Sequence, residues 1–250
     1  MIKKITSHIN PLIKHVVALH SGTYRQQSQE YIAQGERVIS TLIAAHTIPI
    51  NLFVTEDLVE RAKTLVSDDR IVIVADSIIK KMSTTLNPSG MLATFSIPPA
   101  PSYDALSTGI VLFELQDPGN VGTLIRTAVA MNKKTAIFIN SVDPWNTKVV
   151  QASAGAIGMI NIFCMSWNDL LVHKQNIPLC ALIVSQKNNP RSSNLQNALL
   201  VIGNEGAGLP RTVIGECEEK ISLAMPGGFE SLNAAVAGSI ALYITTTAHK

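Results

Sequence analysis

The stretch Asp117-Pro118-Gly119-Asn120-Val121-Gly122-Thr123 follows directly on an apolar run at residues 110–115. Glycine after a strand lets backbone N–H groups turn toward a ligand at close range. In an open α/β sheet, small molecules bind at this end of the strands. The stretch therefore predicts a strand, then a ligand-facing loop, and then a helix over residues 121–131.

Two later stretches have the same arrangement of an apolar run and a glycine-containing loop. Gly203-Asn204-Glu205-Gly206-Ala207-Gly208-Leu209-Pro210 follows the run 199–202, and Met225-Pro226-Gly227-Gly228-Phe229-Glu230-Ser231-Leu232-Asn233 follows the run 221–224. With the first stretch they predict one composite pocket, and so an enzyme. Alternation of strands and helices predicts a mainly parallel sheet. The other elements expected in this region are strands at 134–139, 159–164 and 179–185 and a helix at 148–155.

A proline-rich segment, Ile97-Pro98-Pro99-Ala100-Pro101-Ser102, marks the clearest boundary in the chain. Its prolines suit an extended linker and cannot continue a helix or a central strand. We therefore expect a small α/β domain over residues 1–96, a linker over 97–106 and a second α/β domain over 107–250.

The amino-terminal part alternates between strand-like and helix-like segments and holds no convincing catalytic constellation. Thr55 and Asp76 each stand at the start of a helical pattern. They are expected to cap these helices, because their side chains can accept from the free N–H groups of a first turn. The expected helices are 36–45, 55–66 and 76–82, and the expected strands are 50–54, 70–74 and 91–97.

The composition is that of an apolar globular protein, with 46% hydrophobic and 15% charged residues among 250. The three cysteines form no C-x-x-C pair, which argues against a disulfide framework or a zinc site and fits a reducing cytoplasm. The net charge of +2 gives no global basic field that would indicate nucleic-acid binding. No apolar run reaches the roughly 18 residues of a membrane span, so no membrane partner is expected. Residues 234–248 are expected to form a buried helix with a frayed end.

The glycine loops fit the common nucleotide and hydrolase motifs poorly. The stretch 203–210 has no Lys-Ser/Thr pair and is not a Walker loop, and neither it nor the first stretch has the G-x-G-x-x-G spacing of a dinucleotide site. Ser231 does not lie in a G-x-S-x-G elbow, and no histidine is near any of the loops in the sequence. A carboxylate pair of Glu205 and Glu230 stays open, because the sequence does not give their separation.

Taken together, the three stretches resemble the motifs of one known family. Residues 115–128 resemble the first motif of the SpoU (TrmH-like) RNA 2′-O-ribose methyltransferases, residues 202–209 the second and residues 221–233 the third. Their order and separation match, and the resemblance covers the second half of the chain to its end. The amino-terminal part, from Ile5-Thr6-Ser7 to Gly35, is similar to the family's substrate-binding domain, although more loosely.

This resemblance implies a carboxy-terminal α/β knot, in which the chain threads a deep trefoil, although knots are nearly absent from proteins. It also implies S-adenosylmethionine bound in the knot, a homodimer, and transfer of the sulfonium methyl group to a ribose 2′-hydroxyl of structured RNA. Ribosomal RNA is favoured over transfer RNA, because the ribosomal branch of the family commonly carries such an amino-terminal domain.

By the same resemblance, Gly203, Asn204 and Gly206 belong to the cofactor loop, and Glu205 lies near the active centre. The alternatives are an ordinary strand-to-helix turn for the glycines and a carboxylate that caps a helix start for Glu205. Arg126 is the position that the family's motif marks as catalytic. A guanidinium is effectively always protonated, so a bidentate contact that fixes the target phosphate costs less than proton abstraction from the 2′-hydroxyl. Both roles of Arg126 stay open.

Asn120, Ser231 and Asn233 complete the catalytic group that the resemblance implies. They would orient Arg126, the ribose and the cofactor. Their alternative role is turn chemistry, since Asn and Ser also satisfy loop backbones.

Three apolar residues, Leu223, Met225 and Leu232, are expected to wall the adenine pocket. An apolar wall with few polar groups suits an adenosyl ligand. Plain core packing is the alternative for all three.

Two positions depart from the family's pattern. Gln151-Ala152-Ser153-Ala154-Gly155-Ala156 stands where the family often has Arg-Ala-Ser-x-Gly-Ala, and Gln34-Gly35 replaces the frequent Glu-Gly. Neither touches the cofactor loops, so both bear on the substrate and its affinity, and not on methyl transfer. Gln151 and the modest net charge leave room for a non-catalytic RNA-binding or ribosome-assembly protein on the same fold. A tRNA 2′-O-methyltransferase or a resistance methylase would differ only in its target.

Overall fold

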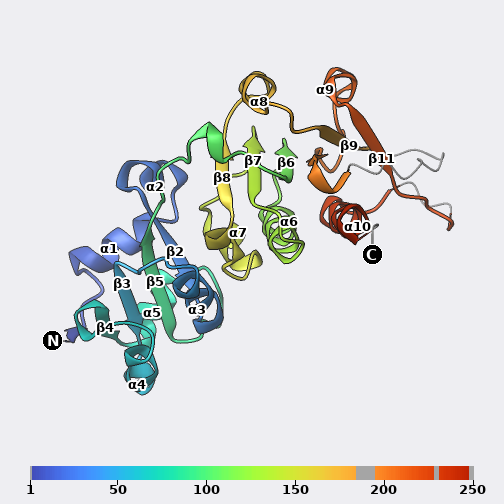
Figure 1. Ribbon diagram of the computed structural model, residues 1–250. Coiled ribbons are helices and arrows are strands. Elements are labelled where there is room, and N and C mark those ends of the chain that lie inside the picture. The colour runs from blue at the N-terminus through green and yellow to red at the C-terminus, as the bar shows by residue number, and fades with distance from the viewer. Residues whose placement is uncertain (1, 184–194, 228–230, 248–250) are drawn as a thin grey trace. The chain divides into compact units, whose positions relative to one another are not determined.

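The computed structural model describes residues 2–183, 195–227 and 231–247 (Figure 1). Contacts between residues divide the chain into two compact units. The carboxy-terminal unit consists of residues 100–144 and 160–250, and the amino-terminal unit of the remaining residues. Among the described helices, none is long and apolar enough to cross a membrane.

The amino-terminal unit is built on a mixed five-stranded sheet. Its strands are β1 (Lys3–Ile5), β2 (Glu30–Gln34), β3 (Asn51–Val54), β4 (Ile71–Val74) and β5 (Met91–Ser96). Their order across the sheet is β1-β4-β3-β5-β2. Strand β5 runs antiparallel to both of its neighbours, whereas β4 pairs in parallel with β1 and β3.

Helices pack on this sheet through apolar faces. They are α1 (Pro11–Ala18), α2 (Gly22–Ser28), α3 (Glu36–Ala44), α4 (Val59–Lys63) and α5 (Asp76–Met82), with a 3-10 turn η1 (Glu56–Leu58) before α4. Ile13 of α1, Ile79 of α5 and Phe53 of β3 belong to one buried cluster. Full burial of a side chain of this size stabilises the fold by about 1.5–3 kcal/mol.

A segment from the second half of the chain, residues 145–159, packs with the amino-terminal unit. It contains α7 (Thr147–Ala152), which contacts β2, and a 3-10 turn η4 (Ala156–Met159), which contacts α3. The ring centroids of Trp145 and Tyr31 lie 4.8 Å apart. This aromatic contact anchors the segment to β2, because such pairs add to the stabilisation that burial gives.

The carboxy-terminal unit is built on a sheet of six described strands. They are β6 (Gly109–Phe113), β7 (Thr135–Ile139), β8 (Asn161–Cys164), β9 (Leu179–Ile183), β10 (Leu199–Ile202) and β11 (Glu219–Ser222). Their order is β11-β9-β10-β6-β7-β8, and every neighbouring pair is parallel. The carboxyl ends of β6 and β10 therefore lie side by side, with Ile202 opposite Leu112.

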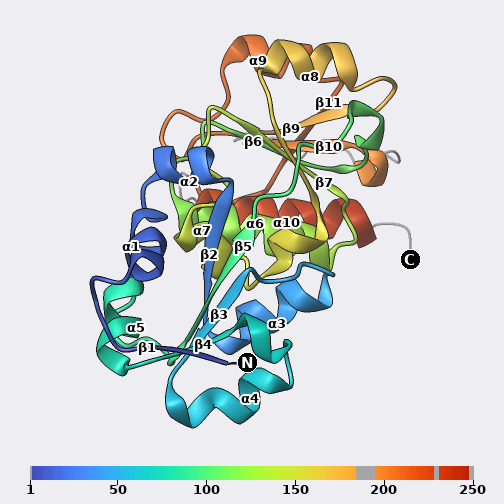
Figure 2. The same ribbon diagram turned by 90° about the vertical axis from the view of Figure 1, so that its left-hand side faces the viewer.

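Helices lie on both faces of the second sheet (Figures 1 and 2). They are α6 (Pro118–Ala130), α8 (Trp167–His173), α9 (Arg211–Glu216) and α10 (Ala234–Thr247). Helices α6 and α10 pack together on one face, and α8 and α9 lie on the other. Leu170 of α8 and Val213 of α9 join Val111 and Ile137 of the sheet in a buried core.

Most elements expected from the sequence are present within a few residues of their predicted ends. The strand expected at 199–202 is β10 itself, and the helix expected at 36–45 is α3. The sequence did not predict β1, β2, α1, α2, α8 or α9. Each of these is short, and short segments carry little periodicity from which to assign a type.

Both expected caps in the amino-terminal unit are wrong. Thr55 precedes η1 and makes no side-chain capping hydrogen bond. Asp76 is already inside α5, and the N-cap position is held by Ala75. The helix expected at 55–66 is in fact the turn η1 followed by the five residues of α4.

The expected burial of the last helix is only partly correct. Ala241 and Leu242 of α10 are fully buried, but Val236, Ile240 and Tyr243 are 47%, 39% and 59% exposed. An apolar stripe of α10 therefore faces away from its own unit. Two expected element ends, at Ser185 and Ala248, lie outside the described residues.

Candidate active site

The loop after β10 is closed by one of its own side chains. Asn204 Oδ1 accepts hydrogen bonds from the backbone N–H groups of Gly206 and Ala207 at 2.9 and 3.1 Å. Its Nδ2 donates to the carbonyl oxygen of Glu114 at 2.9 Å, which ties the loop to the end of β6. The side-chain amide of Asn204 thus bonds to backbone groups of the protein. These bonds shape the loop that the sequence predicts to hold a cofactor.

The two glycines predicted for the cofactor loop differ in how much space a side chain would have. A Cβ on Gly203 would lie 2.6 to 2.7 Å from backbone atoms of Gly208 and Leu209, which cannot move aside cheaply. A Cβ on Gly206 would lie 3.6 Å from its nearest neighbour, an ordinary contact distance. Packing of the loop itself therefore demands glycine at 203, whereas at 206 only a ligand would demand it.

Helix α6 begins at Pro118, earlier than the sequence analysis expected, and this places Asn120 in the first helical turn. Asp117 is the N-cap, and its Oδ1 accepts from the backbone N–H of Asn120 at 2.7 Å. Proline is favoured at the first helical position, because its missing N–H is not needed there. The proline and glycine that indicated a loop therefore open the helix.

The side chain of Asn120 joins the three glycine-containing loops. Its Nδ2 donates to Glu205 Oε1 at 3.0 Å, and its Oδ1 accepts from Asn233 Nδ2 at 3.0 Å. Asn233 Oδ1 accepts from the backbone N–H groups of Ala235 and Val236 at 2.9 and 3.3 Å, at the start of α10. The structure therefore brings together three of the predicted catalytic residues, one from each loop.

The two ends of this network set the orientation of both amides. A carboxylate can only accept, so the nitrogen of Asn120 must face Glu205. The oxygen of Asn120 then faces Asn233, which must present its own nitrogen and keeps its oxygen for the N–H groups of α10. Each hydrogen bond stabilises the fold by only about 0.5–1.5 kcal/mol. The main effect of the network is therefore to hold the three loops in one relative geometry.

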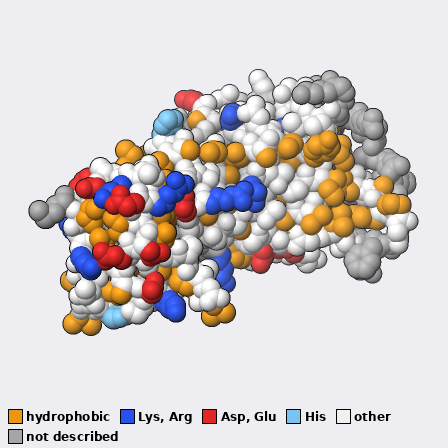
Figure 3. Space-filling model, turned by 90° about the horizontal axis from the view of Figure 1, so that it is seen from below, with side chains coloured by type: hydrophobic (Ala, Val, Ile, Leu, Met, Phe, Trp, Pro, Cys, Tyr) orange, Lys and Arg blue, Asp and Glu red, His pale blue; other side chains and the backbone are white. Residues whose placement is uncertain are grey.

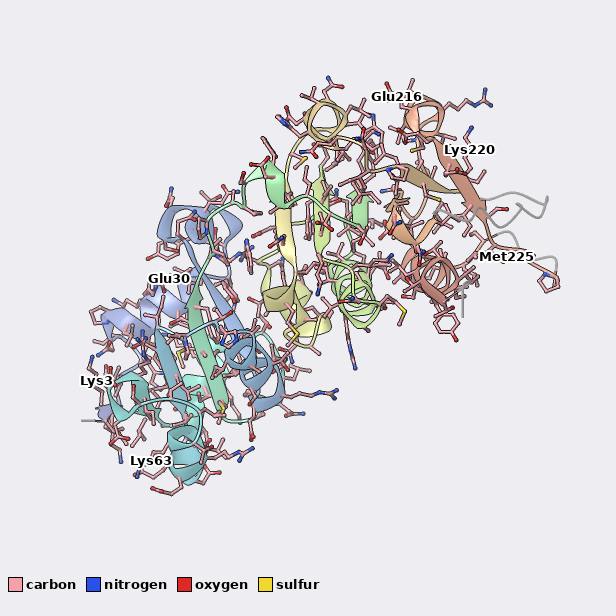
Figure 4. The ribbon with its side chains drawn as sticks, viewed as in Figure 1. Lys3, Glu30, Lys63, Glu216, Lys220 and Met225 are labelled. Carbon is pink, nitrogen blue, oxygen red and sulfur yellow. The ribbon has the colours of Figure 1, made fainter. Side chains whose placement is uncertain are left out.

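The three loops surround a cavity of about 340 Å³. Met225 lies on the segment that follows β11 (Figure 4). The predicted site residues that line the cavity are Gly203, Asn204, Glu205, Gly206, Leu223, Met225, Ser231 and Leu232. Ile183 of β9, Ile214 of α9 and Ala237 of α10 add to the wall. The sequence analysis missed these three, since a single apolar residue carries no local signal of a cavity.

The three apolar residues predicted to wall the adenine pocket are not buried. Leu223 and Met225 are half-buried, and Leu232 is 39% exposed. Side chains with this exposure that line a cavity are available to a ligand, and plain core packing does not describe them. Ser231 is exposed at the same wall, whereas Glu230 lies outside the described residues.

Glu205 is the one charged side chain among the described residues that line the cavity. A ligand with phosphate groups would face this carboxylate with no lining cation to compensate. A ligand that combines an apolar ring system with a positive charge fits this wall better. S-adenosylmethionine has this composition, with an adenine ring and a sulfonium, so the described lining fits this cofactor.

Arg126 lies outside both the network and the lining of the cavity. It is exposed on α6, and no described residue forms a hydrogen bond or ion pair with its guanidinium. It comes six residues after Asn120, or about 9 Å along the helix axis. Because Cα–Cβ bonds on a helix tilt toward its N-terminus, that of Arg126 points toward the first turn of α6.

Known protein families match both parts of the chain. The model of the SpoU rRNA methylase family matches residues 107–243, and that of the MRM3-like substrate binding domain matches residues 10–93. Both matches agree with the resemblance that the three motifs and the amino-terminal part suggested.

Individual relatives are similar over nearly the whole chain. An uncharacterized tRNA/rRNA methyltransferase of Synechocystis is 29% identical over 256 residues, which cover 97% of this chain and 93% of the relative. The 23S rRNA (guanosine(2553)-2′-O)-methyltransferase of Bacillus subtilis is 23% identical over 246 residues, which cover 97% and 98% of the two chains. An AdoMet-bound rRNA methyltransferase from Sinorhizobium meliloti, 24% identical, shares the fold with a TM-score of 0.87, over 100% of this chain and 99% of that one. Because the family model spans more than half of it, the chain belongs to the SpoU rRNA methylase family.

Proposed function

We propose that this protein transfers the methyl group of S-adenosylmethionine to a ribose 2′-hydroxyl of structured RNA, and that the RNA is ribosomal. The network from Asn233 through Asn120 to Glu205 carries this proposal, because it joins three loops around one cavity. Among the described residues that line this cavity, Glu205 alone has a charged side chain, and its charge is negative. The match of residues 10–93 to a substrate-binding domain supports an RNA substrate. The Bacillus subtilis relative is named as a 23S rRNA 2′-O-methyltransferase, which supports the ribose 2′-oxygen as the methyl acceptor and rRNA as the class of RNA.

S-adenosylmethionine supplies a methyl group on a positively charged sulfur. The carboxylate of Glu205 stabilises positive charge in the cavity. The bound cofactor would give up this methyl group to the ribose 2′-oxygen and leave as a neutral thioether, and the hydroxyl proton would pass to solvent water. We assign Arg126 to the phosphate of the target nucleotide, since a guanidinium is a poor base and can hold a phosphate through two N–H groups.

Asn120→Asp is expected to disrupt the network that joins the loops. The new carboxylate would oppose Glu205 at hydrogen-bond distance, where two acceptors repel each other. We expect methyl transfer to fall at least about tenfold, and the free energy of unfolding to fall by about 1 kcal/mol. Turnover with labelled cofactor and urea titration measure the two effects.

Glu205→Gln provides the matched partner for this substitution. In the double variant an amide N–H again faces a carboxylate, and the carboxylate can still accept from Asn233. The double variant is expected to recover the stability that Asn120→Asp alone loses. Equal stability of the single and double variants would show that the hydrogen bond between positions 120 and 205 contributes nothing in solution.

We further propose that the carboxy-terminal unit is knotted. Strand β10 lies between β9 and β6, although β7 and β8 separate β6 from β9 in the chain order. Helix α10 then packs against α6 and β10. A late strand inserted between two earlier ones, followed by a helix against the first helix of the unit, supports threading of the chain end.

We also propose a homodimer that uses α10. Hydrophobic side chains gather over the carboxy-terminal unit on the face that Figure 3 shows. Val236, Ile240 and Tyr243 form the exposed stripe of α10, and exposed apolar patches of this kind mark interaction surfaces. Ile240→Asp is expected to convert the dimer to a monomer, as measured by light scattering after size exclusion. Val172→Asp, at an apolar position of α8 that is 74% exposed, is the control that should stay dimeric, and a monomeric native protein would contradict the proposal.

The function is tested with RNA from a strain that lacks this protein. Labelled S-adenosylmethionine and the purified protein should place label as a 2′-O-methyl nucleoside in one rRNA fragment after nuclease mapping. Label in the tRNA fraction would keep the reaction and overturn the substrate. No label, with no cofactor binding by calorimetry, would support a non-catalytic RNA-binding role.

We place the reaction in the cytoplasm, since the three cysteines are unpaired, as is usual in reducing compartments.

A further inference from the structure

The amino-terminal unit has a second pocket, of about 150 Å³, that the proposed chemistry does not use. Its lining residues come from the end of β2, from α5 and the loop that follows it, from the start of β5 and from α7. Its apolar lining comes from Ile79, Met91 and Leu92. Its polar lining residues are Gln34, Ser83, Thr85, Asn87, Ser89 and Gln151.

No lining residue of this pocket is an acid, a base or a histidine. A phosphate would meet no cation there, and a metal ion would meet no carboxylate or imidazole. Amides and hydroxyls above an apolar floor instead suit a flat, neutral group with hydrogen-bonding edges. A nucleobase of single-stranded RNA has this chemistry, and proteins recognise such bases by their faces and their edges.

Gln34 is held in place and still has hydrogen-bonding capacity left. It is 6% exposed, its Oε1 accepts from Ser83 Oγ at 2.9 Å, and its Nε2 donates to Thr84 Oγ1 at 3.3 Å. Because Ser83 gives its proton to Gln34, Thr85 Oγ1 must be the donor in its 2.9 Å contact with Ser83. Within the described part of the chain, one N–H and one acceptor site of Gln34 have no partner, and a glutamine amide can bind a base edge through such a pair.

The size and the rim of the pocket agree with a single base. A cavity of about 150 Å³ accommodates a six-membered aromatic ring. Leu86, whose two chain neighbours are Thr85 and Asn87, is 95% exposed. Burial of this exposed side chain against an apolar face, such as that of a base, would stabilise the bound ligand.

We propose that this pocket receives one unpaired nucleobase of the RNA substrate. The inference rests on the proposed function, since it takes RNA as the substrate. It also gives a role to the two departures from the family's pattern, because Gln34 and Gln151 both line this pocket. Both side chains are uncharged amides. The pocket of this chain therefore selects its base by neutral hydrogen bonds.

The test compares two probes that bind the full-length protein without cofactor: a randomised RNA dodecamer and an abasic ribose-phosphate strand of the same length. Leu86→Ala, Asn87→Ala and Gln151→Ala remove exposed side chains, so the fold should survive. Each is expected to weaken binding of the dodecamer about tenfold and to leave binding of the abasic strand unchanged. Gln27→Ala and Ile48→Ala, at exposed positions of the same unit that do not line the pocket, should bind both probes like the native protein.

Two results would overturn the inference: pocket variants that bind the dodecamer as tightly as the native protein does, or a native protein that binds both probes equally. Methyl transfer is measured in parallel on rRNA from cells that lack the protein. A native protein that discriminates between the probes but transfers no methyl group would refute the proposed reaction and support the pocket. Methyl transfer that proceeds normally in all three pocket variants, with unchanged dodecamer affinity, would refute the pocket and support the reaction.

Discussion

Arg126→Ala is expected to lower kcat/KM for RNA methylation by at least about 100-fold, because the target phosphate loses its bidentate anchor and the ribose is misplaced. The melting temperature and the Kd for S-adenosylmethionine should not change. Arg126 is exposed on α6, lines no part of the cavity and bonds to no described residue. Turnover, thermal unfolding and calorimetry of the same preparation measure the three quantities.

Arg211→Ala is the matched control, because Arg211 is also an exposed arginine of the carboxy-terminal unit and lies on α9. It should keep native turnover. An Arg126→Ala protein that is folded, binds cofactor and keeps full activity would remove this residue from the mechanism.

Arg126→Lys separates the two roles that the sequence left open. Lysine keeps the positive charge but loses the bidentate geometry, so a phosphate anchor predicts partial activity with a raised KM for RNA. Lysine also loses its proton more readily than arginine. If the residue were the base, activity of the lysine variant would therefore recover steeply as the pH rises toward 10.

Gly203→Ala is expected to destabilise the protein by about 1–3 kcal/mol, as overpacking of a close-packed site does. It should also weaken binding of S-adenosylmethionine at least about tenfold. The added Cβ would lie within 2.7 Å of the backbone at Gly208 and Leu209, so the loop must open at the wall of the cavity. Urea titration gives the first effect and calorimetry the second.

Gly206→Ala, three positions along the same loop, is the control for this steric argument. Its Cβ has room, so the free energy of unfolding should stay within about 0.5 kcal/mol of the native value. Any loss of cofactor affinity in this variant then reports direct contact with the ligand. Unchanged stability and cofactor affinity in Gly203→Ala would show that the loop tolerates the extra atom.

The start of α6 shows what neighbouring residues in the sequence can and cannot predict. Pro118 and Gly119 look like loop residues, and the sequence analysis therefore began the helix at 121. The structure begins it at Pro118 under the Asp117 cap. The cap could have been inferred from the sequence, because Asp followed by Pro is a common helix opening.

The partners of Asn120 could not have been inferred in this way. Glu205 and Asn233 are 85 and 113 residues away in the chain, and nothing in the first motif specifies which side chains its amide will meet. Packing of residues 145–159 with the amino-terminal unit is equally non-local. Both depend on how the strands are ordered in space, and local propensity does not encode that order.

The sequence by itself determined the alternation of strands and helices and the three glycine-containing loops, because these depend on short runs of neighbouring residues. The class of chemistry followed from the resemblance of these loops to the motifs of a known family. Only the tertiary structure decided that Asn120 links the loops, that packing demands Gly203 while leaving Gly206 to the ligand, and that Gln34 and Gln151 line one pocket. These features are contacts between segments far apart in the chain. Their energies arise from burial and hydrogen-bond geometry that exist only once the sheets have formed.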